Sequence, residues 1–404
     1  MIPRSASTPP RPGARGSLDS STGEKEGNGP VPLASHQTTV DRTLGRRDRD
    51  WVCEAVGRIG ADFNRSSDTH LIKLDLPCLE NVDLYLKDES THPSGSLKHR
   101  LARSLFLYGL CNGWIRKDTP IIESSSGSTA ISEAYFARLL GLPFIAVLPD
   151  TTAKEKIAEI EFYSGECHRV APNRIYDEAA RLAGRLNGHY VDQFTYAERA
   201  TDWRGNNNIA DSMFTQMSRE RFVVPKWVVV SAGTGGTSST IGRYIRYRPE
   251  VFTATKLCVV DPENSVFFDF FRTGDATVTA ERGSRIEGIG RPRVEPSFLP
   301  AVIDRMMRVP DEASIATVWW LETVLGKKCG GSTGTNLYGA LRIAAEMIRN
   351  GEAGSIVTMI CDPGERYLDT YFDTGWLEDQ GFDIQIHMER LRSFATSGRL
   401  DPDH

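Results

Sequence analysis

The sequence predicts an α/β fold of two domains, each a three-layer αβα arrangement around a mostly parallel, twisted sheet. Short apolar segments alternate with stretches of helical periodicity, in one block before about residue 200 and a second block after it. Strands that alternate with helices in this way form right-handed βαβ units, whose parallel sheets are covered on both faces. A chain of 404 residues is also long enough for two such domains with a cleft between them.

The elements of the first block are bounded by glycine and proline. The segment 82–86 alternates polar and apolar residues, and the chain then breaks at Pro93 and Gly95. Leucines recur at helical spacing from Leu97 onward, so Lys98 falls in the first turn of a helix. Further extended segments are expected at 69–76, 120–123, 144–148, 166–170 and 189–191. Further helices are expected near 54–63 and at 130–140, 153–163 and 176–186.

The second block repeats this alternation with more strongly apolar strands. These strands are expected at 227–230, 257–260 and 356–360. Helices are expected at 238–247, 319–325 and 337–347, with a less regular region at 262–300.

Changes in composition set the expected domain boundaries. Residues 1–49 are rich in Pro, Gly, Ser and Arg without apolar periodicity, which predicts a disordered tail lacking the apolar core of a secretory signal. We expect a larger α/β domain from residues 50–90 and 200–380, and a smaller one from residues 91–199. Residues 381–404 are expected to form a C-terminal tail.

Composition and charge narrow the class of function. The formal net charge of −5 and the pI near 6.0 argue against binding of nucleic acid through bulk electrostatics. No apolar run approaches the length of a membrane span. The seven cysteines are scattered and none forms a Cys-x-x-Cys pair, so we expect no metal site and no disulfide framework, but reduced thiols in a cytoplasmic protein.

Lys98 is the first candidate for chemistry. The N-terminal end of a helix dipole is positive, so this position destabilises the ammonium form and favours the neutral amine, which condenses with an aldehyde. A lone lysine is more often a solvated surface charge, so support must come from other segments.

Two loops provide that support, because each joins a predicted strand to a predicted helix. In residues 231–237, glycines let the backbone turn tightly and aim N–H groups at one point, which makes a cradle suited to a phosphate. The spacing matches neither a P-loop nor G-x-G-x-x-G, and a plain glycine-rich turn is the alternative. In residues 124–129, hydroxyl and N–H groups at a helix start can donate to a carboxylate, or can simply cap the helix.

An amine, a phosphate cradle and a carboxylate cradle together indicate an aldehyde cofactor that carries a phosphate and acts on an amino acid. Pyridoxal 5′-phosphate meets all three needs.

Residues from about 51 to 372 resemble the fold type II pyridoxal-phosphate family of cysteine synthase and cystathionine β-synthase. Six motifs carry this resemblance, and they occur in the same order as in the family. They are PSGSLKHR at 93–100, SSGST at 125–129, DQF at 192–194, GTGGT at 233–237, EGIG at 287–290 and GSTG at 331–334. Within the family, the chain most resembles the actinobacterial type of L-cysteine desulfhydrase. That likeness includes GSLKHRLARSLFLY at 95–108, RATDWRGNNN at 199–208 and RIEGIGRPRVEP at 285–296.

The resemblance implies a role for each matched residue, with Lys98 as the Schiff-base lysine and catalytic base. Cofactor contacts are implied for Lys98, Ser128, Gly233, Thr234, Gly235, Gly236, Thr237 and Ser332. Substrate-carboxylate contacts are implied for Ser125, Ser126, Gly127, Thr129 and Gln193. A neutral hydroxyl at Ser332, facing the pyridine nitrogen, would favour prompt β-elimination over transamination. The chain departs from the family at Ser128, where cysteine synthases commonly carry an asparagine that bonds the cofactor's 3′-oxygen.

The implied reaction is elimination of hydrogen sulfide from L-cysteine through an aminoacrylate, giving pyruvate and ammonia. The same residues would serve a cysteine synthase, which replaces the leaving group of O-acetylserine or O-phosphoserine by sulfide. A cystathionine β-synthase-like enzyme, a serine or threonine dehydratase and a non-catalytic cofactor-binding sensor are further alternatives. The resemblance also implies a cytoplasmic homodimer that binds a small amino-acid substrate.

Overall fold

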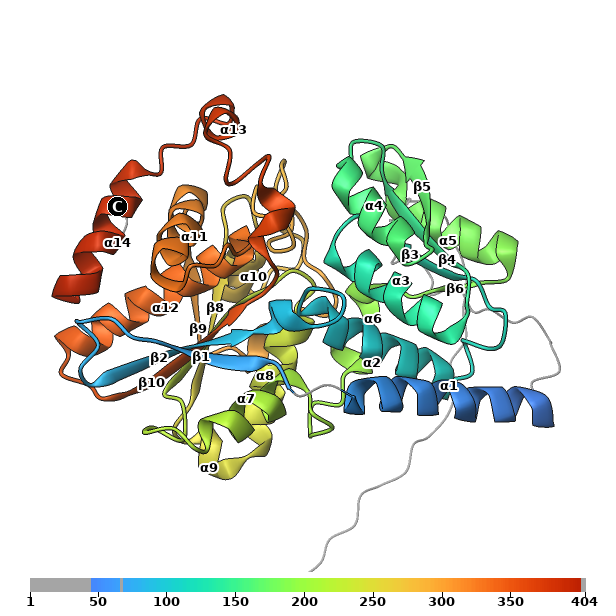
Figure 1. Cartoon of the computed structure of the whole chain (residues 1–404), viewed down its shortest axis with the longest axis horizontal. Coiled ribbons are helices and arrows are strands. Elements are labelled where there is room, and N and C mark those ends of the chain that lie inside the picture. Colours follow the sequence, from blue (N-terminus) through green and yellow to red (C-terminus); the bar gives the residue numbers. More distant parts are fainter. Residues whose placement is uncertain (1–44, 66–67, 401–404) are drawn as a thin grey trace, which may run out of the picture. The chain divides into compact units, whose positions relative to one another are not determined.

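The computed structural model describes residues 45–65 and 68–400. Within these residues the strands form one sheet of six and one of four (Figure 1). The strands are β1 (His70–Leu74), β2 (Val82–Asp88), β3 (Ile121–Ser124), β4 (Phe144–Pro149), β5 (Glu166–Val170), β6 (His189–Tyr190), β7 (Trp227–Ser231), β8 (Lys256–Asp261), β9 (Arg305–Arg308) and β10 (Gly354–Ile360). The α-helices are α1 (Arg46–Asn64), α2 (Lys98–Cys111), α3 (Ser128–Leu140), α4 (Lys154–Phe162), α5 (Ile175–Leu186), α6 (Gln193–Ala200), α7 (Ile209–Met217), α8 (Gly236–Tyr247), α9 (Pro249–Phe252), α10 (Phe267–Thr273), α11 (Asp311–Leu325), α12 (Gly331–Arg349), α13 (Thr374–Asp379) and α14 (Gln385–Ser397).

The larger sheet has the strand order β1-β2-β10-β7-β8-β9, and only the edge pair β1 and β2 is antiparallel. Alternate residues of its strands point to opposite faces. Val228 and Val230 pack in a cluster with residues of α7, α8 and α10, whereas Val229 packs in a cluster with residues of α11, α12 and α14. Both faces are therefore covered, which is why the central strands are apolar throughout.

The smaller sheet has the order β5-β4-β3-β6, and all its pairs are parallel. Ile121 packs on one face with α1, α2 and α3, and Ile122 packs on the other face with α5. The predicted α/β class, with mostly parallel sheets between layers of helices, is confirmed.

Most expected elements are present, and one strand and several helices of the described chain were not expected: β9, α6, α7, α9, α10, α13 and α14. Strand β9 is short, has arginine at both ends and lies at the edge of its sheet, so its apolar pattern covers only two methionines. Helices α7 and α10 are also short, and α10 lies within the region expected to be irregular. Short elements carry little periodic signal, because they span too few turns to repeat a pattern.

Both ends of the described chain differ from the expected boundaries. The expected tail at 1–49 lies outside the described residues, except that α1 begins at Arg46. Helix α1, expected with the larger unit, packs instead with the helices of the smaller sheet through Ala55 and Ile59. The expected C-terminal tail contains α14, whose Leu391 and Phe394 are fully buried against the larger sheet's core. Apolar residues three apart on a helix share one face, and here that face packs on α11.

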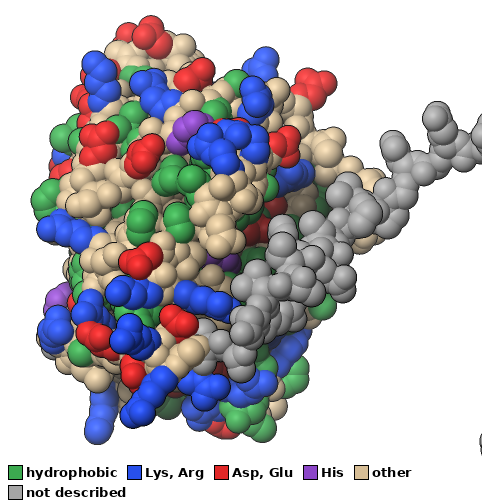
Figure 2. Space-filling model, turned by 90° about the vertical axis from the view of Figure 1, so that its right-hand side faces the viewer, with side chains coloured by type: hydrophobic (Ala, Val, Ile, Leu, Met, Phe, Trp, Pro, Cys, Tyr) green, Lys and Arg blue, Asp and Glu red, His purple; other side chains and the backbone are tan. Residues whose placement is uncertain are grey.

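Figure 2 shows acidic and basic side chains interspersed over the face that carries the smaller sheet and its helices. None of the helices in the described part of the chain is long and apolar enough to cross a membrane. Among residues 45–65 and 68–400, no group of three or more His, Cys, Asp or Glu side chains is arranged to hold a metal ion.

Candidate active site

A cavity of about 520 Å³ lies where strands of both sheets end and the following helices begin. Helices α2, α3, α6, α8 and α12 all contribute residues of their first turn to its wall. Helix N-termini present free N–H groups and a positive dipole end, so a cavity walled by several of them attracts anions. Every residue to which the sequence assigned a role lines this one cavity: Lys98, Ser125, Ser126, Gly127, Ser128, Thr129, Gln193, Gly233, Thr234, Gly235, Gly236, Thr237 and Ser332.

Lys98 is the first residue of α2. The preceding turn places Gly95 at a φ of +74°, a left-handed conformation that favours glycine, and the Leu97 N–H donates to the Cys361 carbonyl at 2.9 Å. Among the described residues, no side chain forms a hydrogen bond or ion pair with the Lys98 amine. Burial, with a further contribution from the charge of Arg291, lowers the pKa of Lys98 to about 8. The neutral, nucleophilic fraction of the amine near neutral pH is therefore far larger than for an ordinary lysine, although it remains the minor form.

The glycine loop after β7 turns tightly against two neighbouring segments. Gly235 is the N-cap of α8 and has a φ of +90°. A Cβ at this residue would lie 2.5 Å from the Phe298 Cα, and a Cβ at Gly233 would press on the Gly288 carbonyl oxygen. Only glycine allows the backbone to approach so closely, and the loop thereby brings the N-terminus of α8 to the cavity.

The serine loop after β3 meets α6 at the cavity wall. The Thr129 hydroxyl, in the first turn of α3, donates to the Gln193 side-chain oxygen at 2.8 Å. Gln193 is the first residue of α6, because the Asp192 side chain accepts the Thr195 N–H and caps that helix. Two predicted substrate residues that are far apart in the sequence are thus in direct contact.

Ser332 lies in the first turn of α12 and is buried at the cavity wall. It lies beside the thiol of Cys361, which accepts from the Asn336 amide nitrogen at 3.2 Å. Burial raises the pKa of Cys361 to about 12, so its neutral thiol is the form present at neutral pH.

Arg366 is a cavity residue that the sequence did not reveal. It lies in the short turn at Gly364–Tyr367 after β10 and donates to the Ser128 hydroxyl at 3.1 Å and to the Ser94 carbonyl at 3.2 Å. Its guanidinium also forms a two-point pair with Glu159 of α4, at 3.2 and 2.7 Å. Arg366 therefore ties the Lys98 segment, the serine loop and α4 together.

A second ion pair joins α4 to the cavity from the same side. Lys156, one turn before Glu159, pairs with Glu287 of the EGIG turn. That turn is held by Tyr371, whose hydroxyl accepts the Glu287 N–H at 2.8 Å and donates to the Arg285 carbonyl at 2.9 Å. Neither pair has a sequence signature, because the partners come from distant segments.

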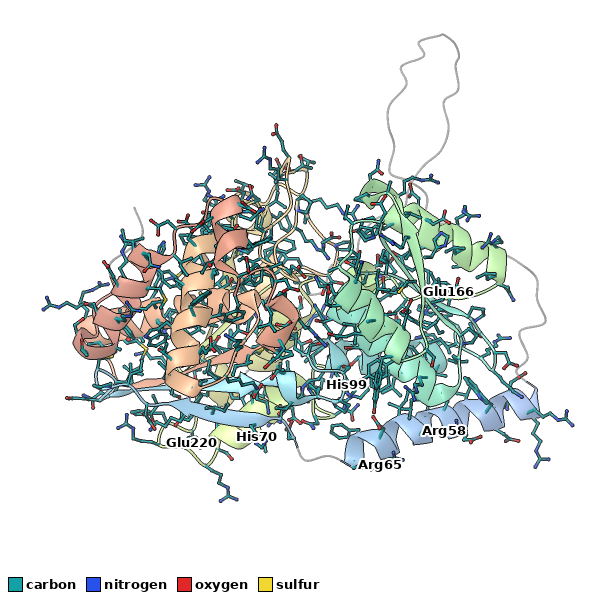
Figure 3. The ribbon with its side chains drawn as sticks, turned by 45° about the horizontal axis from the view of Figure 1, so that its top comes forward. Arg58, Arg65, His70, His99, Glu166 and Glu220 are labelled. Atoms are coloured by element: carbon teal, nitrogen blue, oxygen red, sulfur yellow. The ribbon has the colours of Figure 1, made fainter. Side chains whose placement is uncertain are left out.

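His99, labelled in Figure 3, follows Lys98 in α2 but does not line the cavity. Its ring packs against Phe136 of α3, and its Nδ1 lies 3.0 Å from the Ser94 hydroxyl. Burial lowers the pKa of His99 to about 2, so it is a neutral packing residue at neutral pH. The cavity as a whole has one free amine, several helix N-termini and a hydroxyl-rich wall. These features define an enzyme that uses an aldehyde cofactor bearing an anionic group.

Comparison with known proteins identifies the family. A family model described as pyridoxal-phosphate dependent enzyme matches residues 66–362. The L-cysteine desulfhydrase Cds1 of Mycobacterium tuberculosis is 59% identical over 356 residues, covering 87% of this chain and 96% of that protein. A cysteine synthase of Dictyostelium discoideum is 28% identical over 318 residues, covering 75% of this chain and 81% of that protein. The crystal structure of O-ureido-L-serine synthase has a TM-score of 0.65 at 23% identity, covering 82% of this chain and 96% of that one, which is a likeness of fold.

The chain belongs to the pyridoxal-phosphate dependent enzyme family, and its cofactor is pyridoxal phosphate. The predicted membership of fold type II, near the desulfhydrase, is confirmed. The cavity fits this cofactor, because an unpartnered amine suits the aldehyde and a glycine turn at a helix N-terminus suits the phosphate.

Proposed function

We propose that this protein is an L-cysteine desulfhydrase, a carbon–sulfur lyase. It converts L-cysteine and water into hydrogen sulfide, pyruvate and ammonia. The observation that carries the proposal is the 59% identity to a named L-cysteine desulfhydrase across nearly the whole of that protein.

The residues of the cavity have distinct duties in this reaction. When bound, pyridoxal phosphate withdraws electrons from the α-carbon of the substrate. The residues at 233–237 would hold its phosphate, Ser128 would contact its ring oxygen, and Ser332 would contact its ring nitrogen. The Lys98 amine would hold the cofactor's aldehyde and, when free, would serve as the base that takes the α-proton of the substrate. Its pKa of about 8 suits a base that works near neutral pH.

The serine loop and Gln193 bind the substrate carboxylate. Ser125, Ser126, Gly127 and Thr129 supply hydroxyl and N–H donors, and the bond from Thr129 to Gln193 holds that side chain against the loop. A carboxylate fixed at this wall orients the Cα–H bond toward the Lys98 amine. Sulfide then leaves from the β-carbon.

A cysteine synthase is the second candidate, favoured by the similarity to the cysteine synthase of Dictyostelium discoideum. The two activities differ in whether sulfide leaves or enters at the β-carbon, and the same side chains serve both. We also propose, from family likeness, that the protein is a cytoplasmic homodimer. Light scattering coupled to gel filtration tests the dimer.

The test is a product assay on the purified, cofactor-loaded protein. With L-cysteine alone we expect sulfide and pyruvate in equal amounts. Lys98→Ala should abolish both, whereas Lys117→Ala, at an exposed residue outside the cavity, should not change the rate.

If the protein makes cysteine from O-acetylserine and sulfide but releases no sulfide from cysteine, it is a cysteine synthase and not a lyase. Turnover of serine or threonine alone would indicate a dehydratase. Cofactor binding with no turnover of any of these amino acids would indicate a sensor.

A further inference from the structure

Two carboxyl side chains lie buried behind the serine loop. Glu123 is in β3 and Glu133 is in α3, and both have 0% of their surface exposed. Among the described residues, no lysine, arginine or histidine pairs with either carboxyl. Neither oxygen of Glu133 accepts a hydrogen bond from a donor group in this part of the chain. Two adjacent carboxyl groups without a cation cannot both be ionised at low energy.

Glu123 holds the backbone of two cavity segments. One of its oxygens accepts the Ser124 N–H at 2.6 Å, and the other accepts the Gln193 N–H at 3.1 Å. Ser124 opens the serine loop and Gln193 opens α6, so a single carboxyl group joins the two segments that meet at the carboxylate wall. The bond from Thr129 to Gln193 lies on the cavity side of the same junction.

The hydrogen-bond partners decide where a shared proton resides. Glu123 accepts two N–H groups, which favours its carboxylate form, whereas Glu133 has no donor to stabilise a charge. The two carboxyl groups lie close enough to interact directly, so the acid form of Glu133 can donate to Glu123. Burial, with a further contribution from the charge of Asp192, raises the pKa of Glu123 to about 7. Burial and the proximity of Glu123 raise the pKa of Glu133 well above its usual range.

The other titratable groups that face Glu123 have their own partners or remain neutral. The Asp192 carboxylate accepts the Thr195 N–H at the start of α6. The Tyr190 hydroxyl bonds the Ser124 hydroxyl at 2.6 Å, and burial raises the pKa of Tyr190 far above neutrality. Burial also raises the pKa of Tyr176. None of these groups supplies a positive charge.

We propose that Glu133 is a positioning residue: it shares a proton with Glu123 and so holds Gln193 and the serine loop in place for the substrate carboxylate. This inference rests on the proposed role of Gln193 and Thr129 as the carboxylate site. Loss of the shared proton places two negative charges behind that site, which separates the segments and repels the incoming carboxylate.

The experiment measures binding of L-alanine, an amino acid without a β-leaving group, from the absorbance change of the cofactor-loaded protein. Glu133→Gln keeps a donor to Glu123 but does not titrate, whereas Glu133→Leu removes the donor. At pH 7 we expect Glu133→Leu to bind L-alanine about tenfold more weakly, and Glu133→Gln to stay within about threefold of the unchanged protein. The affinity for pyridoxal phosphate, measured separately, should not change in either variant.

The pH dependence gives a second readout. The ratio of the Glu133→Gln affinity to the wild-type affinity should rise between pH 7 and 10, because only the wild type acquires the second charge. Titration of L-alanine and of the cofactor cancels in this ratio. Three results would overturn the proposal. The affinity ratio could be independent of pH, Glu133→Leu could bind L-alanine as tightly as the wild type, or a variant could lose as much affinity for pyridoxal phosphate as for L-alanine. L-Alanine binding requires no elimination, so a failed desulfhydrase assay leaves this test valid.

Discussion

The glycine loop that is proposed to hold the cofactor phosphate allows a quantitative test at Gly235. Substitution by alanine meets two obstacles. The φ of +90° is left-handed, and a side chain there costs about 1–2 kcal/mol. The new Cβ would also lie 2.5 Å from the Phe298 Cα and 2.6 Å from the Ser297 carbonyl oxygen. Both are backbone atoms that cannot turn away, and such overpacking typically costs about 1–3 kcal/mol.

The loop relieves this strain by moving away from the segment at 297–298, which displaces its N–H groups from the phosphate. A loss of about 2 kcal/mol, the lower end of the combined range, corresponds to about 30-fold weaker cofactor binding. In an absorbance titration of the cofactor-free protein, we expect Gly235→Ala to bind pyridoxal phosphate at least about 30-fold more weakly than the wild type. The matched control is Gly184→Ala in α5, where a Cβ has open space within 4 Å. That variant should bind normally and unfold at the same or a higher temperature. Wild-type cofactor affinity together with a wild-type unfolding temperature in Gly235→Ala would refute the reasoning.

Three further predictions concern stability and the cavity wall. Arg366→Met removes the charged hydrogen bonds that join the Lys98 segment, the serine loop and α4, including the bond to the Ser128 hydroxyl. We expect the free energy of unfolding, measured in urea, to fall by about 2 kcal/mol. An unchanged free energy of unfolding would contradict the assigned contacts. In the folded protein His99 has a pKa of about 2 and is neutral, so below about pH 6.5 it binds a proton only in the unfolded chain. The stability that neutral His99 contributes is therefore present above about pH 6.5. As the pH drops below that value, the free energy of unfolding falls by about 1.4 kcal/mol per pH unit. In urea titrations, the difference in the free energy of unfolding between the wild type and His99→Asn should change with pH by this slope. If the free energies of the two proteins run parallel over this pH range, the prediction is wrong. Asn208→Ala removes a side chain that accepts two N–H groups at the start of α7 and should lower stability by about 1 kcal/mol, unlike Asn112→Ala at an exposed helix end.

Local patterns predicted the elements on which the site depends. Apolar segments bounded by glycine and proline predicted the strands β3, β7 and β10, and the polar loops after β3 and β7 were recognised as anion cradles. Because β3 and β7 belong to different sheets, alternation alone does not place the two loops in one cavity, and only the packing of the two sheets brings them together. Lys98, Gln193 and Ser332 are all found there.

The sequence by itself determined the α/β class, through the alternation of strands and helices along the chain, and indicated the cofactor and the main loops of the cavity, because each loop is encoded within a segment of a few residues. The tertiary structure alone decided which distant side chains support those residues. Arg366 and Glu159 are 207 residues apart, and Glu123 meets the Gln193 backbone across 70 residues. Packing of α1 with the smaller sheet and burial of α14 were likewise unforeseen. Contacts of this kind have no periodicity, since they arise only when the sheets bring the ends of separate strands together.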